Sequence, residues 1–275
     1  MIPGKEGRGK GRGLAVLKDS AFDFDGEEYK AAEGRLHKGL AALAGREGAP
    51  ERLRDPLFAD ALMELMRLVL ERNETISLTS ITEMEEFVTL HLLDSLACVG
   101  LPELESAQRV IDVGSGAGFP GLPLAMLYPD KHFLLTDSLR KRVEFTESAA
   151  SSMGLDNVEA LHARAEAAGR EPALRERFDL ALCRAVGRLP VILEYCLPFV
   201  RVGGAGVFYK TVPAKGEIEE SLLARELLGG GAEARVETYA DILPGRRHAL
   251  YIVGKEHPTP DTYPRRAGLP TKVPL

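Results

Sequence analysis

The chain has 275 residues, of which 45% are hydrophobic, and a formal net charge of -6, so it is long enough to bury the core of one large domain with a smaller addition. No apolar run approaches the roughly 18 to 20 residues of a membrane span, and no apolar signal-type segment follows the basic start, so we expect a cytoplasmic protein that does not enter a membrane. The cysteines, Cys98, Cys183 and Cys196, form no C-x-x-C pair and accompany no histidine cluster at zinc spacing, which excludes a typical disulfide scaffold or metal centre.

Charge is distributed unevenly along the chain. Residues 19–107 hold 19 acidic residues against eight basic ones, whereas the last 30 residues hold six Lys or Arg against two acids. The places where charged residues cluster indicate binding partners better than the net charge does. A basic C-terminal end on an otherwise acidic protein is compatible with binding RNA.

The first third of the chain predicts an arm followed by helices. Residues 1–27 mix glycine and charged residues with little to bury, which is typical of a disordered arm. Apolar residues then recur at helical spacing in 28–43 and 52–73. After the polar stretch TISLTSIT, a third helix is expected from about Glu83 to Leu96. We therefore expect a small helical N-terminal unit over 28–107.

From Arg109 onward, short β-rich runs alternate with helical segments, the pattern of parallel βαβ units. The predicted fold class is α/β: a doubly wound, mostly parallel, seven-stranded Rossmann-like sheet in a domain spanning 108–256. The last two runs have no helix of ordinary length between them, so they are expected to pair antiparallel. The expected strands are 109–113, 132–136, 158–162, 178–183, 205–209, 234–239 and 248–253.

The end of the chain, residues 257–275, contains five prolines in HPTPDTYPRRAGLPTKVPL. Proline interrupts helices, so we expect an extended tail. If the tail is extended, we expect its Arg265, Arg266 and Lys272 to contact RNA phosphates. We also expect that truncating the chain after Lys255 leaves the affinity for the cofactor unchanged. The alternative is a tail that folds back over the domain through its tyrosine and prolines.

A glycine loop follows the first expected strand, in RVIDVGSGAGFPGLPLAMLY. Gly114, Gly116 and Gly118 let the backbone turn sharply and approach a ligand. The same stretch also contains G-x-G-x-x-G, so a dinucleotide remains an alternative to a methyl donor. Asp112 before the glycines and the bulky Phe119, at the position where a pyrophosphate-binding helix begins, favour the methyl donor.

Polar residues at the ends of the next strands complete a candidate cofactor site. Asp137 ends the second strand, where an acid can accept hydrogen bonds from both ribose hydroxyls; a helix cap is the alternative. The backbone of Ala165 and the side chain of Glu166 are positioned to hold an adenine edge, unless Glu166 merely begins a solvated helix. Arg184 ends the fourth strand and can bind a carboxylate, a phosphate or a guanine edge, with a surface salt bridge as the alternative.

Two motifs of other methyltransferases do not occur here. Leu182, rather than proline, precedes Cys183, so the Pro-Cys nucleophile of enzymes that methylate pyrimidine carbon is missing, and Cys183 is expected to be buried filler. No acid or amide followed by Pro-Pro and an aromatic follows the fourth strand. This indicates a target that is already nucleophilic.

Together these segments resemble the bacterial glucose-inhibited division protein B family, whose members methylate N7 of a guanine in 16S ribosomal RNA of the small subunit with S-adenosylmethionine. The resemblance runs from about Glu71 to Lys255. It implies cofactor-binding roles for Gly114, Phe119, Asp137, Ala165, Glu166 and Arg184. It is carried by SLTSITEMEEFVTLHLLDSL, RVIDVGSGAGFPGLPLA, FLLTDSLRKRVEF, NVEALHARAE, FDLALCRAV and PGRRH, with YPRRAGLPTKVPL similar to the tail of many members.

The implied substrate is 16S rRNA or a small-subunit particle, and no obligate protein partner is evident. Ser77, Leu90 and Thr211 depart from the family pattern on the presumed RNA side. No general base is expected, because N7 carries a lone pair and no proton. A small-molecule methyltransferase and a non-catalytic rRNA-binding assembly factor remain alternatives. The candidates for RNA contact are His91, for which a core histidine is the alternative, and Lys141, Arg142, Arg188, Lys210 and Arg247.

Overall fold

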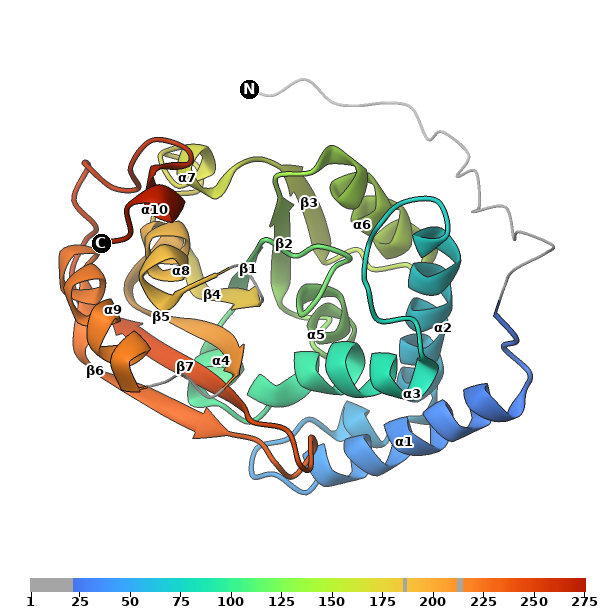
Figure 1. The fold of residues 1–275 in the computed structure, drawn as a ribbon. Helices are drawn as coiled ribbons and strands as arrows, with labels where there is room; N and C mark the ends of the chain where they lie inside the picture. The colour runs from blue at the N-terminus through green and yellow to red at the C-terminus, as the bar shows by residue number, and fades with distance from the viewer. Residues whose placement is uncertain (1–21, 185–186, 212–214) are drawn as a thin grey trace.

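The computed structural model describes residues 22–184, 187–211 and 215–275 (Figure 1). Most of the expected disordered arm, residues 1–21, lies outside the described residues. The described end of that arm is packed: the rings of Phe22 and Phe24 lie 5.9 Å apart, and Phe24 meets Tyr29 edge to face at 6.1 Å.

A seven-stranded sheet in the order β3-β2-β1-β4-β5-β7-β6 forms the centre of the molecule, which confirms the predicted fold class. The strands β1 to β5 pair in parallel, and β7 runs antiparallel to both β5 and β6, so the expected antiparallel last pair is also confirmed. All seven runs are strands, with β5 beginning five residues earlier than expected. Their bounds are β1 Arg109–Val113, β2 His132–Asp137, β3 Val158–His162, β4 Phe178–Arg184, β5 Val200–Thr211, β6 Gly230–Thr238 and β7 His248–Lys255.

Helices cover both faces of the sheet because its buried strands are apolar on both sides. On one face, α5 (Gly121–Leu127) and α6 (Arg140–Ser152) share a buried cluster with the N-terminal helices and with Val110 of β1. On the other face, α8 (Leu189–Cys196), the 3-10 turn Leu197–Phe199 and α9 (Lys215–Leu227) pack against Ile111 and its neighbours, with the short α7 (Ala165–Ala168) beside them (Figure 1). Cys183 is fully buried in this second cluster, as expected.

The N-terminal third contains the expected helices with shifted bounds. They are α1 (Glu27–Leu43), a 3-10 turn (Glu51–Arg54), α2 (Pro56–Asn73), α3 (Met84–Phe87), a π-helical segment (Val88–Leu93), a 3-10 turn (Leu96–Cys98) and α4 (Pro102–Ser106). The single helix expected over 52–73 starts only at Pro56. Asp55 is extended and caps the helix by accepting a hydrogen bond from the Leu57 N–H at 3.0 Å, because a residue before proline is pushed out of the helical region. None of the described helices is long and apolar enough to cross a bilayer.

The expectation of an extended tail is wrong. Residues 257–275 fold back beside α7 and α8 (Figure 1), and Leu269–Lys272 forms the short helix α10. Pro270 lies in the first turn of α10, where a missing N–H costs nothing because that N–H has no partner within a helix. Proline therefore does not exclude a helix that begins at it, and the fold-back alternative describes the structure.

Candidate cofactor and active site

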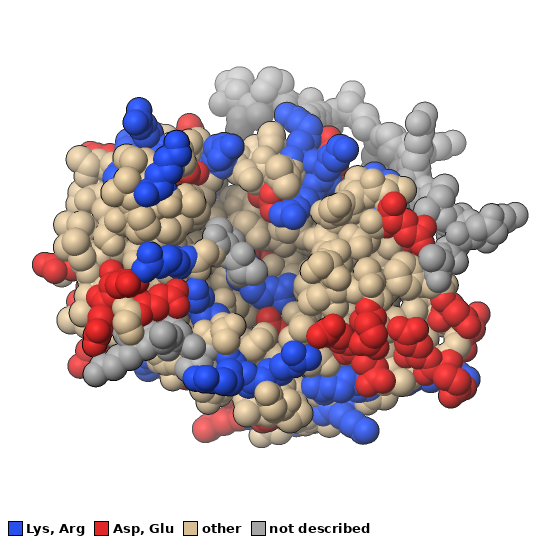
Figure 2. Space-filling model, viewed as in Figure 1, with Lys and Arg blue, Asp and Glu red and all other residues tan. Residues whose placement is uncertain are grey.

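A cavity of about 430 Å³ opens at the carboxyl ends of β1, β2 and β4. The chain leaves β1 and β4 towards opposite sides of the sheet, and ligands bind at such switch points in doubly wound folds. The cavity lies in the hollowed centre of the face shown in Figure 2. Its size suits a ligand such as a nucleoside derivative.

The glycine loop forms one wall of this cavity. Gly114, Gly116 and Gly118 all have positive φ angles, of 79°, 59° and 92°, which side chains rarely allow. At Gly118 a Cβ would also lie 2.4 Å from the side chain of Leu122. The Gly114 N–H donates to the Thr136 carbonyl at 2.8 Å, which ties the loop to the end of β2. Gly114 and Gly116 line the cavity, whereas Gly118 supports the turn behind it.

Asp137 lies at the end of β2 and faces the cavity. Its Oδ2 accepts a hydrogen bond from the Gly116 N–H at 3.0 Å, and its Oδ1 accepts one from the Leu139 N–H at 2.8 Å. Arg142 Nη1 lies 3.6 Å from Oδ2 and also lines the cavity. Helix α6 begins at Arg140 and takes no side-chain cap, so Asp137 is not the helix cap that the sequence left open. A carboxylate has about four lone-pair sites, so capacity for ligand hydroxyls remains.

Asp112 lies beneath the loop and does not line the cavity. Its Oδ2 accepts a hydrogen bond from the Gly121 N–H at 2.9 Å, while Oδ1 has no partner among the described residues. Burial raises the pKa of this carboxyl to about 7. Any contact of Asp112 with a ligand would therefore run through the loop or through water.

The turn from β3 into α7 places Ala165 and Glu166 on the opposite wall of the cavity. Glu166 is only 5% exposed, and its Oε1 accepts a hydrogen bond from the Gly268 N–H at 2.8 Å. It is therefore not a solvated helix start. Tyr195 of α8 lines the same wall.

Arg184, at the end of β4, lies over the Phe119 ring with its guanidinium carbon 5.4 Å from the ring centroid. Both residues line the cavity. The Arg184 Nη1 donates to the Leu90 carbonyl at 2.9 Å and to Asp94 Oδ2 at 3.1 Å. The surface salt bridge that the sequence left open is thus a largely buried one. Because Leu90 contributes its backbone, its departure from the family pattern does not alter this contact.

His91 is half-buried at the cavity wall. Its ring stacks on Phe119 at 5.0 Å, its Nδ1 accepts a hydrogen bond from Arg184 Nη2 at 3.0 Å, and its Nε2 therefore donates to Thr79 Oγ1 at 2.7 Å. Burial, followed by the charge of Arg184, lowers the pKa of His91 to about 3. The imidazole is neutral, and both nitrogens are already used. This arrangement fits the core histidine better than an RNA contact.

The other candidates for RNA contact occupy different surroundings. Lys141 and Arg247 are exposed. Arg188 and Lys210 each pair with a carboxylate of α9, Lys210 at 2.7 Å. The structure thus presents two of these cations to solvent and holds two against a neighbouring helix.

Some residues of the site were missed from the sequence. Asp94 lies one helical turn after His91 in the segment LHLLDSL. Residues with this spacing share a helix face, so the sequence could have predicted that Asp94 points inward as His91 does. Nothing local marks Thr79 or Tyr195, since their places depend on which helices pack together.

Three curated proteins illustrate what the chain resembles. It is 43% identical over 217 residues to a ribosomal RNA small subunit methyltransferase G of Alkaliphilus metalliredigens, covering 78% of this chain and 89% of that protein. The protein of that name from Moorella thermoacetica is 44% identical, covering 76% and 86%. The one from Symbiobacterium thermophilum is 42% identical, covering 89% and 98%. Residues 59–238 match the family model GidB, described as rRNA small subunit methyltransferase G, and the chain therefore belongs to the rRNA small subunit methyltransferase G family.

Proposed function

We propose that the protein transfers a methyl group from S-adenosylmethionine to N7 of a guanine in the 16S rRNA of the small ribosomal subunit. The observation that carries this proposal is the cavity at the switch point, lined by the glycine loop, Asp137 and Glu166, in a chain of this family. Action on ribosomal RNA implies that the protein works in the cytoplasm.

The cavity fits the proposed cofactor in size and in polar groups. Asp137 retains lone pairs for the ribose hydroxyls, and Glu166 retains Oε2 for the adenine edge. Arg184 uses three of its five N–H donors within the protein, so it keeps two for a carboxylate. When bound, S-adenosylmethionine supplies a methyl group on a positively charged sulfur.

The residues around the cavity are suited to positioning rather than to proton transfer. Guanine N7 carries a lone pair and no proton, so its attack on the methyl group needs no base. His91 is neutral and fully engaged, and Asp112 is sealed beneath the loop. Holding donor and acceptor in line can contribute several kcal/mol, up to about 7 to 11 in the best cases. In this proposal, the residues of the cavity wall catalyse the reaction by positioning donor and acceptor.

The surface around the cavity supports an RNA substrate. Lys and Arg side chains lie along much of the rim of the hollow in Figure 2, whereas Asp and Glu gather over the N-terminal helices and over α9. A second hollow of about 410 Å³ lies beside the cavity, between residues 75–77 and residues 138–142, and includes Ser77, Arg140 and Lys141. A phosphate backbone entering the cavity from this side would meet positive charge.

The decisive experiment is to incubate the protein with methyl-labelled S-adenosylmethionine and small subunits or free 16S rRNA, and then to locate the label. We expect 7-methylguanine at one position of 16S rRNA. Label on a small metabolite would favour the small-molecule alternative. Binding of rRNA without any label transfer would favour the assembly factor.

A second experiment tests the RNA-facing surface through salt dependence. Each phosphate contact contributes about 0.7 to 0.9 to the slope of log affinity against log salt. We expect Lys141→Ala and Arg247→Ala each to make that slope shallower by about one contact. Lys38→Ala, which changes an exposed lysine on α1, is the matched control and leaves the slope unchanged.

A further inference from the structure

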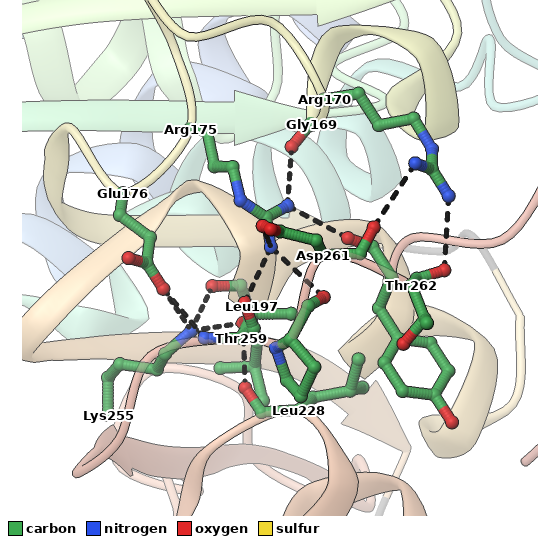
Figure 3. Close-up of polar contacts among 12 residues, drawn as sticks. Gly169, Arg170, Arg175, Glu176, Leu197, Leu228, Lys255, Thr259, Asp261 and Thr262 are labelled. Atoms are coloured by element: carbon green, nitrogen blue, oxygen red, sulfur yellow. Dashed lines mark hydrogen bonds and ion pairs between the residues drawn. The ribbon is translucent and has the colours of Figure 1, made fainter.

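The residues between α7 and β4 hold the C-terminal segment 256–275 in place through hydrogen bonds. Figure 3 shows the Arg175 guanidinium among backbone carbonyls. Its Nη1 donates to Gly169 at 3.0 Å and to Tyr263 at 2.8 Å, and its Nη2 donates to Thr259 at 2.6 Å and to Pro260 at 3.1 Å. One largely buried cation thus joins the C-terminal segment to the α7–β4 connection. That connection begins at the cavity wall.

A buried lysine anchors the start of the same segment (Figure 3). Lys255 is fully buried, and its Nζ donates to the Leu197 carbonyl at 2.8 Å and to Thr259 Oγ1, with Glu176 Oε1 at 3.4 Å. The Thr259 N–H donates to that Glu176 oxygen at 2.7 Å, and the Thr259 hydroxyl donates to the Leu228 carbonyl at 2.8 Å. Every polar group here has a partner, so this part of the segment has a defined position.

Arg265 fixes the middle of the segment to α8. Its backbone N–H donates to Glu194 Oε1 at 2.8 Å, and its side chain donates to the same carboxylate at 2.9 Å from Nε and 2.6 Å from Nη2. The Glu194 side chain is fully buried. A buried carboxylate needs such a partner, so Arg265 serves the fold and is not a free phosphate ligand.

Beyond Arg265, the segment reaches the cofactor cavity itself. The Gly268 N–H donates to Glu166 Oε1 at 2.8 Å, and the Thr271 hydroxyl lies 2.9 Å from the hydroxyl of Tyr195. Glu166 and Tyr195 both line the cavity. Among the described residues, the Gly268 amide is the hydrogen-bond donor to the Glu166 carboxylate, and this fixes which carboxylate oxygen remains for a ligand.

We propose that Gly268 and Thr271 form part of the cofactor site, with the Gly268 amide and the Thr271 hydroxyl positioning Glu166 and Tyr195 at its adenosine side. The inference rests on the proposed cofactor and goes beyond it, because it gives the C-terminal segment a role in cofactor binding. A carboxylate already held in its binding orientation loses less entropy when a ligand arrives. This reverses the expectation that removing the tail leaves cofactor affinity unchanged.

The test compares the full chain with a chain that ends after Arg266. This truncation keeps the Arg175, Lys255 and Arg265 contacts and removes Gly268 and Thr271. We expect the dissociation constants of S-adenosylmethionine and of adenosine to rise by the same factor, about three- to tenfold. The KM for the cofactor rises with them, while the single-turnover rate at saturating cofactor is unchanged. Lys272→Gln, an exposed change in the same segment, is the control and binds both ligands as the full chain does.

The outcomes separate this inference from the proposed function. Unchanged affinities in the truncated chain overturn the inference, and so does an equal loss in Lys272→Gln or a loss confined to S-adenosylmethionine. A full chain that binds no S-adenosylmethionine overturns the proposed function instead. If the truncated chain does not fold, Thr271→Val and Tyr195→Phe each remove one hydroxyl of the Thr271–Tyr195 pair in the full chain, and unchanged affinities in both variants overturn the inference.

Discussion

The guanidinium of Arg184 lies 3.1 Å from the carboxylate of Asp94, so the end of β4 is bound to the N-terminal helical unit beside the cofactor cavity. The other oxygen of Asp94 accepts hydrogen bonds from Tyr239 at 2.8 Å and from His248 Nδ1 at 3.0 Å. Burial alone would raise the pKa of Asp94, but the His248 hydrogen bond and the Arg184 charge outweigh it and hold the pKa below its usual value. One charged carboxylate thus joins β4, β7 and the segment after β6.

Replacing Asp94 tests how much this junction contributes to stability. Asp94→Ala leaves the Arg184 charge and two polar groups without their partner, so we expect the free energy of unfolding to fall by about 3 to 5 kcal/mol. Equilibrium denaturation in urea measures it. Glu86→Ala breaks an exposed pair with Arg246 and should cost at most about 1 kcal/mol. Equal effects of the two variants would contradict the role given to Asp94.

Asp137 holds the glycine loop and faces the cavity, so Asp137→Ala is expected to weaken binding of S-adenosylmethionine and of its demethylated product. The loss of a charged acceptor costs about 1.5 to 3 kcal/mol, or roughly ten- to a hundredfold in affinity. Calorimetric titration measures both ligands. Asp130→Ala, at an exposed turn, should bind like the unaltered protein, and tight binding of NAD in place of S-adenosylmethionine would defeat the cofactor assignment.

The rate of methyl transfer should vary little with pH. The target nitrogen needs no base, and His91, with a pKa of about 3, stays neutral throughout the neutral range. Asp112, whose pKa is about 7, does not line the cavity and has no contact with the reacting groups. We expect the single-turnover rate at saturating cofactor to be nearly flat between about pH 6.5 and 9. A log-linear rise with a slope near one across that range would show that an ionising base takes part.

Because Lys255 is buried, the free energy of unfolding should depend on pH in the alkaline range. Burial lowers its pKa from 10.5 to about 8, so between these values the unfolded chain binds more protons and stability rises with pH. This gain in the free energy of unfolding is complete above about pH 10.5, where Lys255 is neutral in both states, and is lost as the pH falls through about 8. Denaturation at pH 7.5, 9 and 10 should show the full chain gaining up to about 3 kcal/mol relative to Lys255→Met. Parallel pH curves for the two proteins would contradict this.

The strands, their pairing class and the glycine loop could be predicted from the sequence because they depend on local patterns. Apolar runs of strand length separated by helical segments predicted the seven strands, and β1 and β3 begin and end as expected. The positive φ angles of Gly114, Gly116 and Gly118 require glycine whatever surrounds them. The placement of Asp137 at a strand end follows from the same periodicity.

Only the tertiary structure decided which of these groups are available to a ligand. Arg184 was expected to bind the cofactor and His91 to contact RNA or lie in the core, yet these two residues bind each other. Arg184 also binds Asp94, which lies 90 residues away in the chain. The tail was expected to extend into solvent, yet Gly268 binds Glu166, 102 residues away. A hydrogen bond between such distant groups depends on how helices and strands pack. Local periodicity determines which elements form, and packing determines which polar groups they bring together.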